Sequence, residues 1–425
     1  MKKGETVKLN PFAFLQQLSG KAGPIDDIFT DIKKLDAASI YSIDKNGITY
    51  QRSAIQYVDN ASVKDSFDII DSQFALYTEK DNPLIVLLSS GYDSRLNLAF
   101  TMRHTKKNPV YAFHRLRTNK EHDIAKSVAD VYRIPFSSAT KDMFENELYS
   151  SFLDNDFINC SNGVMRDMLL RWKLHISWIK LAVPDGVLIG FGDEAHKGKY
   201  YHQIKNLQQD TAKYFGREID QFETDYFNIS TKHFRDWQSE FFNDIYKKSE
   251  CFKDRYSRLD FIHYHTYITK TVGARCPYFN HFLGIPFPFL DNNFLSVVFS
   301  LPSSEKINAK LTYDFIKKIN PKLIQIPFIS GNQQTFQRPS GVYIKTLIRN
   351  MYRKYKPSKI VPTIIPLNNE LREAFTGAKS DVTQRLEKYY LVGGRPLKIR
   401  RNFGILMYQY LRNLEKKLNV TFILK

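Results

Sequence analysis

The chain has 425 residues, 43% of them hydrophobic and 14% aromatic, which is enough apolar material for a large core and excludes a globally disordered protein. No apolar run reaches the roughly 18 residues of a membrane-spanning helix, and three widely spaced cysteines form no disulfide framework. The formal net charge is +18, and no apolar run follows the short basic start, so we expect a cytoplasmic protein without a signal peptide or transmembrane segment.

The first 78 residues predict a small β element followed by one helix. Residues 1–35 carry few signals. Two short alternating strands are predicted within 36–58 around the turn at Asn46-Gly47, because glycine supplies the positive φ that hairpin turns need. Apolar residues then recur at helical spacing over 61–77.

Strands and helices alternate over the next part of the chain. The continuous apolar run at 84–88 is typical of a strand buried on both faces of a parallel sheet. Further strands are predicted at 109–113, 135–136 and 186–189, and helices after residue 94 and at 120–132, 141–153 and 164–182. The alternation predicts an α/β fold with a doubly wound parallel sheet.

The C-terminal part is rich in helix signals, and no strand is predicted beyond residue 205. Its last 85 residues carry 18 Lys and Arg against 5 Asp and Glu. This basic excess suits a polyanion, a membrane face or an anionic substrate, but a solvated basic surface has the same composition. Amphipathic helices are predicted at 343–355 and 404–418, and the predicted segments are 1–78, 79–340 and 341–425.

Two small polar turns follow the first and last predicted strands of the sheet. They read Ser89-Ser90-Gly91-Tyr92-Asp93-Ser94 and Gly190-Phe191-Gly192-Asp193-Glu194. Ligands of parallel sheets bind at the carboxyl ends of the strands, where helix N-termini present unpaired amides to anions. Two aspartates, Asp93 and Asp193, beside such a backbone suit Mg²⁺ and nucleotide phosphates. The alternative is a pair of plain turns in which a serine and Asp193 act as helix N-caps.

The common phosphate-binding sequences are missing from these turns. The chain has no GxxxxGK[ST] sequence, and no GxGxxG follows the first strand. We also expect no lysine from either turn to contact phosphates. Backbone amides and a metal ion would then do most of the phosphate binding.

Three segments in order resemble the ATP-pyrophosphatase (PP-loop) group. The first turn is similar to its SGGxDS loop, and the second turn, with Gly198 and Tyr200, is similar to the GxGxDE…GGY segment of asparagine synthetases. Residues 286–291, which read PFPFLD, resemble the PFLD segment of the same enzymes. Over residues 80–325 the chain resembles the synthetase half of the asparagine-synthetase-like group, whose relatives include β-lactam synthetases and lasso-peptide cyclases.

This resemblance implies a fold and a reaction. The fold would be adenine nucleotide α-hydrolase-like, with helical C-terminal additions and a small N-terminal β remnant. The enzyme would use ATP and Mg²⁺ to adenylate a carboxylate, release pyrophosphate and let an amine or ammonia form an amide. Asp93 and Asp193 would hold the metal and act in catalysis with Glu194. The implied ATP-binding residues are Leu88, Ser89, Ser90, Gly91, Tyr92, Asp93, Ser94, Phe113, Gly190 and Gly192, of which Leu88, Phe113 and Gly190 would border the adenine.

Several positions depart from the family pattern. Ser90 replaces a glycine, which requires a negative φ at this position. Phe191 stands where relatives carry a glutamate or tyrosine that assists the chemistry. The downstream lysine that binds pyrophosphate has no clear match, and Lys306, Lys310 and Arg338 are weak candidates for its role.

The glutaminase half of asparagine synthetases has no counterpart in this sequence. Residue 2 is a lysine, and the first cysteine is Cys160. The nitrogen would come from free ammonia, a separate glutaminase partner or an amine on the substrate, which could be a peptide or a small or sugar-linked carboxylate. Two alternatives remain: a tRNA-modifying PP-loop enzyme that uses the basic segment to bind RNA, and a nucleotide-binding protein that has lost catalysis.

Overall fold

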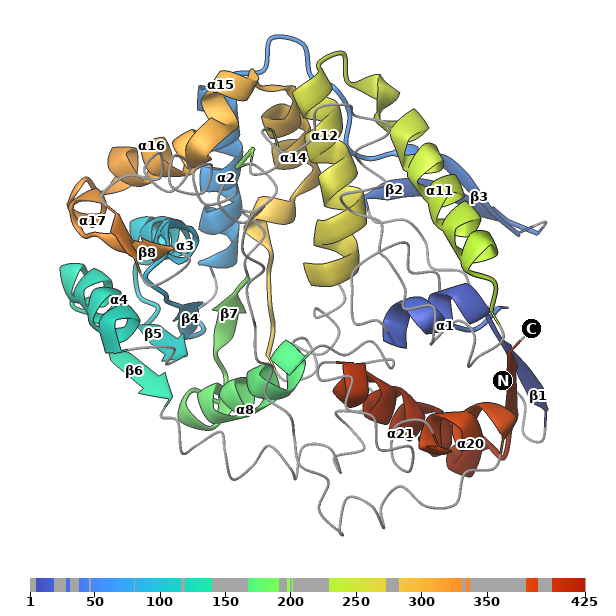
Figure 1. The fold of residues 1–425 in the computed structure, drawn as a ribbon. Helices are drawn as coiled ribbons and strands as arrows, with labels where there is room; N and C mark the ends of the chain where they lie inside the picture. Colours follow the sequence, from blue (N-terminus) through green and yellow to red (C-terminus); the bar gives the residue numbers. More distant parts are fainter. Residues whose placement is uncertain are drawn as a thin grey trace.

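The computed structural model shows a mixed α/β protein with one four-stranded parallel sheet among many helices (Figure 1). This confirms the predicted α/β class, and the finer adenine nucleotide α-hydrolase-like assignment stays a prediction. The residues that the structure describes are 5–18, 28–30, 38–45, 47–79, 81–115, 119–139, 167–190, 197–198, 201, 229–272, 283–330, 334–336, 380–388 and 400–424.

The parallel sheet lies at the centre of the described structure. Its strands are β4 (Leu84–Leu87), β5 (Val110–Arg115), β6 (Phe136–Ala139) and β7 (Val187–Ile189), which confirms all four predicted strands. Their order is β6-β5-β4-β7, so the chain runs outward from β4 to β6 and then returns to the other side of β4. This reversal makes β4 and β7 neighbours, with Leu84 opposite Val187.

Helices cover both faces of the sheet because strand side chains alternate between the faces. Val86 and Ala112 point to one face and join a core cluster that includes residues of α3 and α4. On the other face the ring of Phe113 meets Trp178 of α8, with ring centroids 4.9 Å apart. These helices are α3 (Tyr92–His104), α4 (Asn119–Val131) and α8 (Asp167–Ala182).

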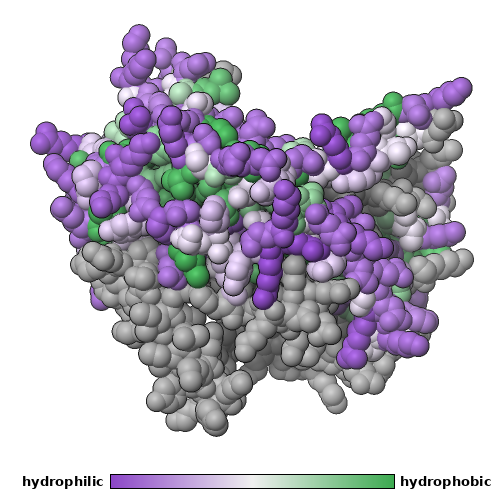
Figure 2. Space-filling view, turned by 90° about the horizontal axis from the view of Figure 1, so that it is seen from above, coloured by the Kyte–Doolittle hydropathy of each residue, from purple (hydrophilic) through white to green (hydrophobic). Residues whose placement is uncertain are grey.

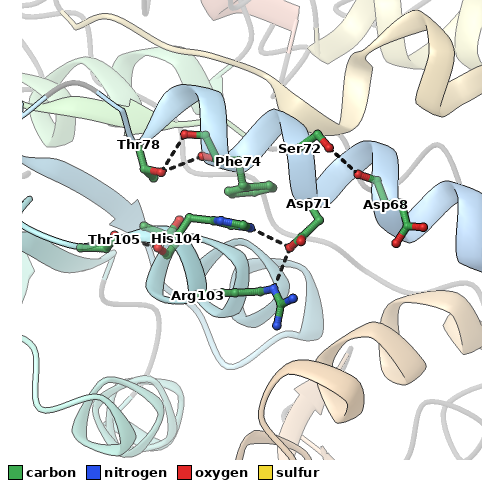
Figure 3. A network of polar contacts seen from close by, with 10 residues as sticks. Asp68, Asp71, Ser72, Phe74, Thr78, Arg103, His104 and Thr105 are labelled. Atoms are coloured by element: carbon green, nitrogen blue, oxygen red, sulfur yellow. Dashed lines mark hydrogen bonds and ion pairs between the residues drawn. The ribbon is translucent and has the colours of Figure 1, made fainter.

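Helix α2 (Val63–Tyr77) packs along α3 and is tied to its C-terminal end. Asp71 of α2 accepts a hydrogen bond from Arg103 Nε at 2.8 Å, and its other close contact is His104 Nε2 at 2.7 Å (Figure 3). Both partners belong to the last turn of α3. The helix whose N-terminus follows the first polar turn is therefore fixed at its opposite end.

Residues 229–325 are mainly helical and close over the same core. Phe315 of α16 meets Phe100 of α3 edge to face, with centroids 6.1 Å apart. The π-helix η3 continues α12 directly. These helices are α11 (Thr231–Lys248), η2 (Ser249–Cys251), α12 (Arg255–His263), η3 (Tyr264–Val272), η5 (Pro288–Leu290), α14 (Asn292–Ser300), α15 (Ser303–Lys306), η6 (Ile307–Ala309), α16 (Lys310–Ile319) and α17 (Lys322–Gln325).

The prediction of no strand beyond residue 205 was wrong. β8 (Phe328–Ser330) pairs antiparallel with β9 (Gln334–Phe336), and β10 (Thr421–Leu424) pairs parallel with β1 (Thr6–Leu9). These strands have only three or four residues each, which is too short for a clear alternating pattern. The β1–β10 pair places the two ends of the chain beside each other (Figure 1).

Other predicted elements near the two ends are confirmed. β2 (Ser39–Asp44) and β3 (Gly47–Ser53) form the antiparallel hairpin, and Gly47 has the expected positive φ of 127°. α21 (Arg400–Leu418) contains the helix predicted at 404–418, and the remaining described helices are α1 (Pro11–Leu18) and α20 (Asp381–Glu387). The predicted helices at 141–153 and 343–355 lie outside the described residues. The three segment boundaries stay predictions.

The surface seen from above in Figure 2 is mostly hydrophilic, with hydrophobic residues in small groups. Two exposed apolar side chains belong to the β2–β3 hairpin, Ile43 at 75% and Ile48 at 55% exposure. Among the described helices, none has both the length and the hydropathy that a membrane crossing requires.

Candidate functional site

The order of the strands places the carboxyl ends of β4 and β7 side by side. In an open parallel sheet a ligand binds outside the carboxyl ends, at the point where the strand order reverses. That point lies between β4 and β7 here, because β5 is on one side of β4 and β7 is on the other. The two polar turns start at Ser89 and Gly190, within two residues of the ends of these strands. The fold therefore brings the starts of both turns to the position expected for a ligand.

The first turn is a compact loop held by its own serines. Ser94 Oγ accepts the backbone N–H of Ser89 at 3.0 Å and lies 2.9 Å from Ser89 Oγ. The N–H of Gly91 donates to Ser89 Oγ at 3.2 Å. Ser89 is exposed, whereas Ser94 is buried, so the Ser89 hydroxyl and the Gly91 amide lie on the outer side of the loop.

Helix α3 begins directly after this loop with Gly91 as its N-cap, so the alternative in which a serine caps the helix does not apply to the first turn. Gly91 has a φ of −78° and supplies no side-chain acceptor. A helix N-terminus without a side-chain cap is suited to an external anion. Ser90 is absent from the described residues with positive φ, so it meets the condition for replacing a family glycine.

Arg95 anchors the loop from the inner side, a role that sequence reasoning missed. Its side chain is fully buried, and Nη2 donates to the Ser90 carbonyl at 2.9 Å. The same guanidinium donates to the carbonyls of Leu323 at 3.0 Å, Ile326 at 2.6 Å and Pro327 at 2.5 Å. Burial lowers the pKa of Arg95 to about 10. The loop is thereby joined to the segment that follows α17.

The second turn starts at a glycine that a close contact requires. Gly190 donates its N–H to the Pro286 carbonyl at 2.8 Å, and a Cβ on Gly190 would lie 2.5 Å from the ring of Phe287. The N–H of Leu188 donates to the Gly284 carbonyl at 3.0 Å. The segment from 284 to 287 therefore runs beside β7 and brings the PFPFLD sequence to the same edge of the sheet.

Gly192, Asp193 and Glu194, together with Phe191, lie outside the described residues, so their assignments as ligands stay predictions. The description resumes at Lys197, whose Nζ forms an ion pair with Asp93 Oδ1. The side chain of Lys197 is 13% exposed and that of Asp93 is 39% exposed. Lys197 lies three residues beyond the second turn, so the expectation that neither turn itself supplies a lysine to phosphates stays a prediction. The sequence signal for Lys197 was its position directly before Gly198.

A buried polar cluster lies around Tyr201, seven residues beyond the second turn. The Tyr201 hydroxyl donates to Asp260 Oδ2 at 2.5 Å, and Lys306 Nζ donates to the same oxygen at 2.7 Å. Burial raises the pKa of Asp260, although the ammonium of Lys306 and the Tyr201 hydroxyl oppose this shift. Gly198 has a φ of +57°, and a Cβ there would lie 2.8 Å from the Tyr201 ring. Sequence reasoning chose Tyr200 for this segment and missed Tyr201.

Two of the three candidates for the missing pyrophosphate lysine pair with carboxylates away from the loop. Lys306 is fully buried and bound to Asp260, so it serves the fold. Lys310 forms surface ion pairs with Glu305 and Asp314. Arg338 lies outside the described residues. Lys197 is the cationic side chain that the structure places against Asp93.

The PFPFLD segment has a structural role in the described chain. Phe289 is fully buried and packs edge to face on Phe74, with centroids 5.7 Å apart. Asp291 is the N-cap of α14, and its Oδ1 accepts the N–H groups of Asn293 at 3.0 Å and Phe294 at 2.9 Å. The segment therefore turns the chain from the edge of β7 into the core.

Two residues predicted to border the adenine lie buried at the ends of neighbouring strands. Leu88 is 2% exposed and Phe113 is 3% exposed, and the N–H of Leu88 donates to the Phe113 carbonyl at 2.8 Å. His114 Nδ1 lies 2.8 Å from the Leu88 carbonyl. Their role in adenine binding stays a prediction.

The donor set suits Mg²⁺ bound together with nucleotide phosphates better than a metal held by protein alone. Among the described residues, no group of three or more His, Cys, Asp and Glu side chains is arranged so that it could hold a metal ion. Mg²⁺ binds nucleotides with one or two carboxylates, and phosphate oxygens and water complete its coordination. Asp93 is a partly exposed carboxylate beside the loop amides, which fits this arrangement.

Comparisons with known proteins add little to this description. No protein-family profile and no curated protein matches the sequence. Among solved structures, the chain is similar to NAD⁺ synthetase from Burkholderia pseudomallei, with 12% sequence identity and a TM-score of 0.25. The match covers 63% of this chain and 93% of the other. A similarity of this size supports no conclusion about activity, so we infer function from the residues of this chain.

Proposed function

We propose that this protein is an ATP-dependent amide-bond synthetase that forms AMP and pyrophosphate. In this reaction a carboxylate would attack the α-phosphate of ATP and displace pyrophosphate. Ammonia or a substrate amine would then attack the acyl-adenylate and displace AMP. The observation that supports this most is the meeting of the Ser89–Ser94 loop and the start of the Gly190 turn at the reversal of strand order. These are the two turns whose residues resemble asparagine synthetases, and they are 100 residues apart in the sequence.

Each group at the site has a role in this proposal. The loop amides and the α3 N-terminus bind the pyrophosphate part of ATP. Asp93, with Asp193, holds Mg²⁺, which supplies positive charge for the departing pyrophosphate. Lys197, which now pairs with Asp93, would be available to a phosphate oxygen if Asp93 held the metal. Leu88, Phe113 and Gly190 border the adenine.

The substrates follow from what the site residues can provide. We propose free ammonia, a partner glutaminase or an amine of the substrate as the source of nitrogen. A peptide or a small or sugar-linked carboxylate is the acid. The basic segment from 341 to 425 favours an anionic substrate or partner.

Pyrophosphate exchange tests the proposal directly. Purified protein is incubated with Mg²⁺, ATP, labelled pyrophosphate and pools of peptide and small carboxylates, and labelled ATP is measured. We expect exchange that depends on a carboxylate and is lost in Asp93→Asn, while the surface control Asp130→Asn keeps it. Binding of Mg-ATP without exchange in any pool would favour a protein that has lost catalysis. Tight and steeply salt-dependent tRNA binding would favour the tRNA-modifying alternative.

A further inference from the structure

Arg95 is a buried cation whose described partners are all neutral. Its side chain has no solvent exposure, and its four hydrogen bonds go to backbone carbonyls. Its remaining donor, Nε, has no hydrogen-bond partner among the described residues. Burying a charge without an opposite charge costs free energy. A residue that breaks this rule beside a candidate site points to a role at that site.

The hydrogen bond to Ser90 sets the direction of one peptide group of the loop. The N–H and C=O of a trans peptide point in opposite directions. Because Arg95 holds the Ser90 carbonyl on the inner side, the N–H of Gly91 points to the outer side. There it meets the exposed Ser89 hydroxyl at 3.2 Å, a contact that a phosphate oxygen could replace.

The other three hydrogen bonds connect the loop to a distant segment. The carbonyls of Leu323, Ile326 and Pro327 belong to the end of α17 and the entry to β8. Tyr92 strengthens this link, because its ring packs edge to face on Phe328 with centroids 4.6 Å apart. The inner side of the loop is thus held against one continuous piece of chain.

The charge of Arg95 also acts on the loop directly. A guanidinium bound only to carbonyl dipoles keeps its unit charge, and in a buried environment solvent and salt screen it weakly. It lies behind the loop, on the side opposite to the Gly91 amide. Its field therefore adds to the attraction of the α3 N-terminus for an anion.

We infer that Arg95 is a positioning residue for pyrophosphate: it aims the Gly91 amide at the phosphate and places an unneutralised positive charge behind the loop. The inference rests on the proposed nucleotide site and adds a residue that never touches the ligand. The PFPFLD segment runs beside β7 and Lys197 pairs with Asp93, so each acts at another part of the site.

Calorimetric titration with three probes tests this role. Inorganic pyrophosphate, Mg-ATP and adenosine are titrated into wild type, Arg95→Met, Arg95→Lys and the control Arg103→Met, which removes a half-exposed arginine from the same helix. We expect Arg95→Met to weaken pyrophosphate and Mg-ATP binding about tenfold or more, the loss of one charge-assisted interaction. Arg95→Lys falls between, because it keeps the charge but cannot reach four carbonyls. Adenosine binding stays the same in all four proteins.

Other outcomes separate this inference from the proposed function. The positioning role would be wrong if folded Arg95→Met bound pyrophosphate with the affinity of wild type. It would also be wrong if the variant lost adenosine affinity as much as pyrophosphate affinity. Neither result would contradict the nucleotide site itself. No binding of any probe by wild type would overturn the site itself. If Arg95→Met does not fold, hydrogen exchange on wild type decides: pyrophosphate must slow exchange in the peptide that contains Gly91, and unchanged exchange at saturating pyrophosphate contradicts the inference.

Discussion

The two polar turns beside the sheet are held in place by different kinds of contact. The first turn is closed by its own residues, since Ser94 binds Ser89 only five positions away. Beyond the second turn, Tyr201 binds Asp260, a residue 59 positions further along the chain. At the start of the second turn, Gly190 packs under the Pro286-Phe287 segment, which arrives from another part of the chain.

The contacts named for the second turn reach distant segments, whereas the first turn combines local contacts with the hydrogen bonds of Arg95 to Leu323, Ile326 and Pro327. Contacts between near neighbours can form as soon as α3 forms, whereas contacts with distant segments require the completed fold. We therefore expect substitutions far from the site in sequence to leave the serine closure of the first turn in place and to disturb the start of the second turn. Four variants test this comparison.

The largest effect is expected from Lys306→Met, which leaves Asp260 buried without its ammonium partner. Breaking a buried pair in this way costs about 3–5 kcal/mol of unfolding free energy, measured by urea denaturation. Burial already raises the pKa of Asp260, so the folded variant binds a proton more readily than the unfolded chain. The deficit therefore shrinks as pH falls. Lys310→Met removes an exposed lysine and should cost below about 1 kcal/mol; equal losses in the two variants would contradict the tertiary anchor.

The second effect concerns the start of the second turn. A Cβ in Gly190→Ala would lie 2.5 Å from the Phe287 ring and 2.7 Å from the Pro286 carbonyl oxygen, so one segment must move. We expect a loss of about 1–3 kcal/mol in unfolding free energy, the usual range for overpacking. Gly284→Ala is the matched control, since a Cβ there meets nothing within 4 Å. A smaller loss for Gly190→Ala than for the control would show that the turn adjusts freely.

The third effect tests the ion pair between Lys197 and Asp93 of the first turn. Lys197→Met should weaken binding of Mg-ATP and pyrophosphate about tenfold, because it removes a charged partner of the phosphates. Adenosine affinity should not change, and the exposed Lys126→Met should behave as wild type. Unchanged pyrophosphate affinity in folded Lys197→Met would mean that the lysine only balances Asp93.

The smallest effect is a pH dependence at the first turn. Burial lowers the pKa of Arg95 to about 10, below that of an arginine in the unfolded chain. Above pH 10 the unfolded chain therefore binds more protons at this site than the folded protein. The unfolding free energy accordingly increases as the pH rises. Urea denaturation measures the unfolding free energy of wild type and of Arg95→Met. The value for wild type minus that for the variant should increase by up to about 1 kcal/mol between pH 8 and pH 10.5. A difference in unfolding free energy that stays constant or decreases over this pH range would argue against a buried charge at Arg95.

Much of the central sheet could be predicted because its signals are local. The apolar run at 84–88 and the alternation up to residue 189 correctly indicated the four strands. The strands of β8, β9 and β10 could not be predicted, because each has only three or four residues and depends on its partner. The ligand roles of Gly192, Asp193 and Glu194 stay predictions.

The site was predictable as a pair of turns but not as a set of contacts. The resemblance selected Asp93 and Ser94, yet it gave no role to Arg95 and placed Lys306 as a candidate for phosphate. Lys306 instead binds Asp260 in the core, and Lys197 takes the place beside Asp93. A lysine in sequence does not reveal which carboxylate it will meet, since long flexible side chains pair according to the packing of distant segments.

The sequence by itself determined where the strands of the central sheet lie and which turns are polar, because hydrophobic periodicity and small residues act over a few neighbours. Only the tertiary structure shows that β7 returns beside β4. The starts of two turns that are about 100 residues apart in the sequence therefore lie at one edge of the sheet. The tertiary structure also shows that a buried arginine holds the Ser90 carbonyl against the segment after α17. Packing sets these arrangements, because the burial of a charge or a ring depends on chain segments that no local pattern identifies.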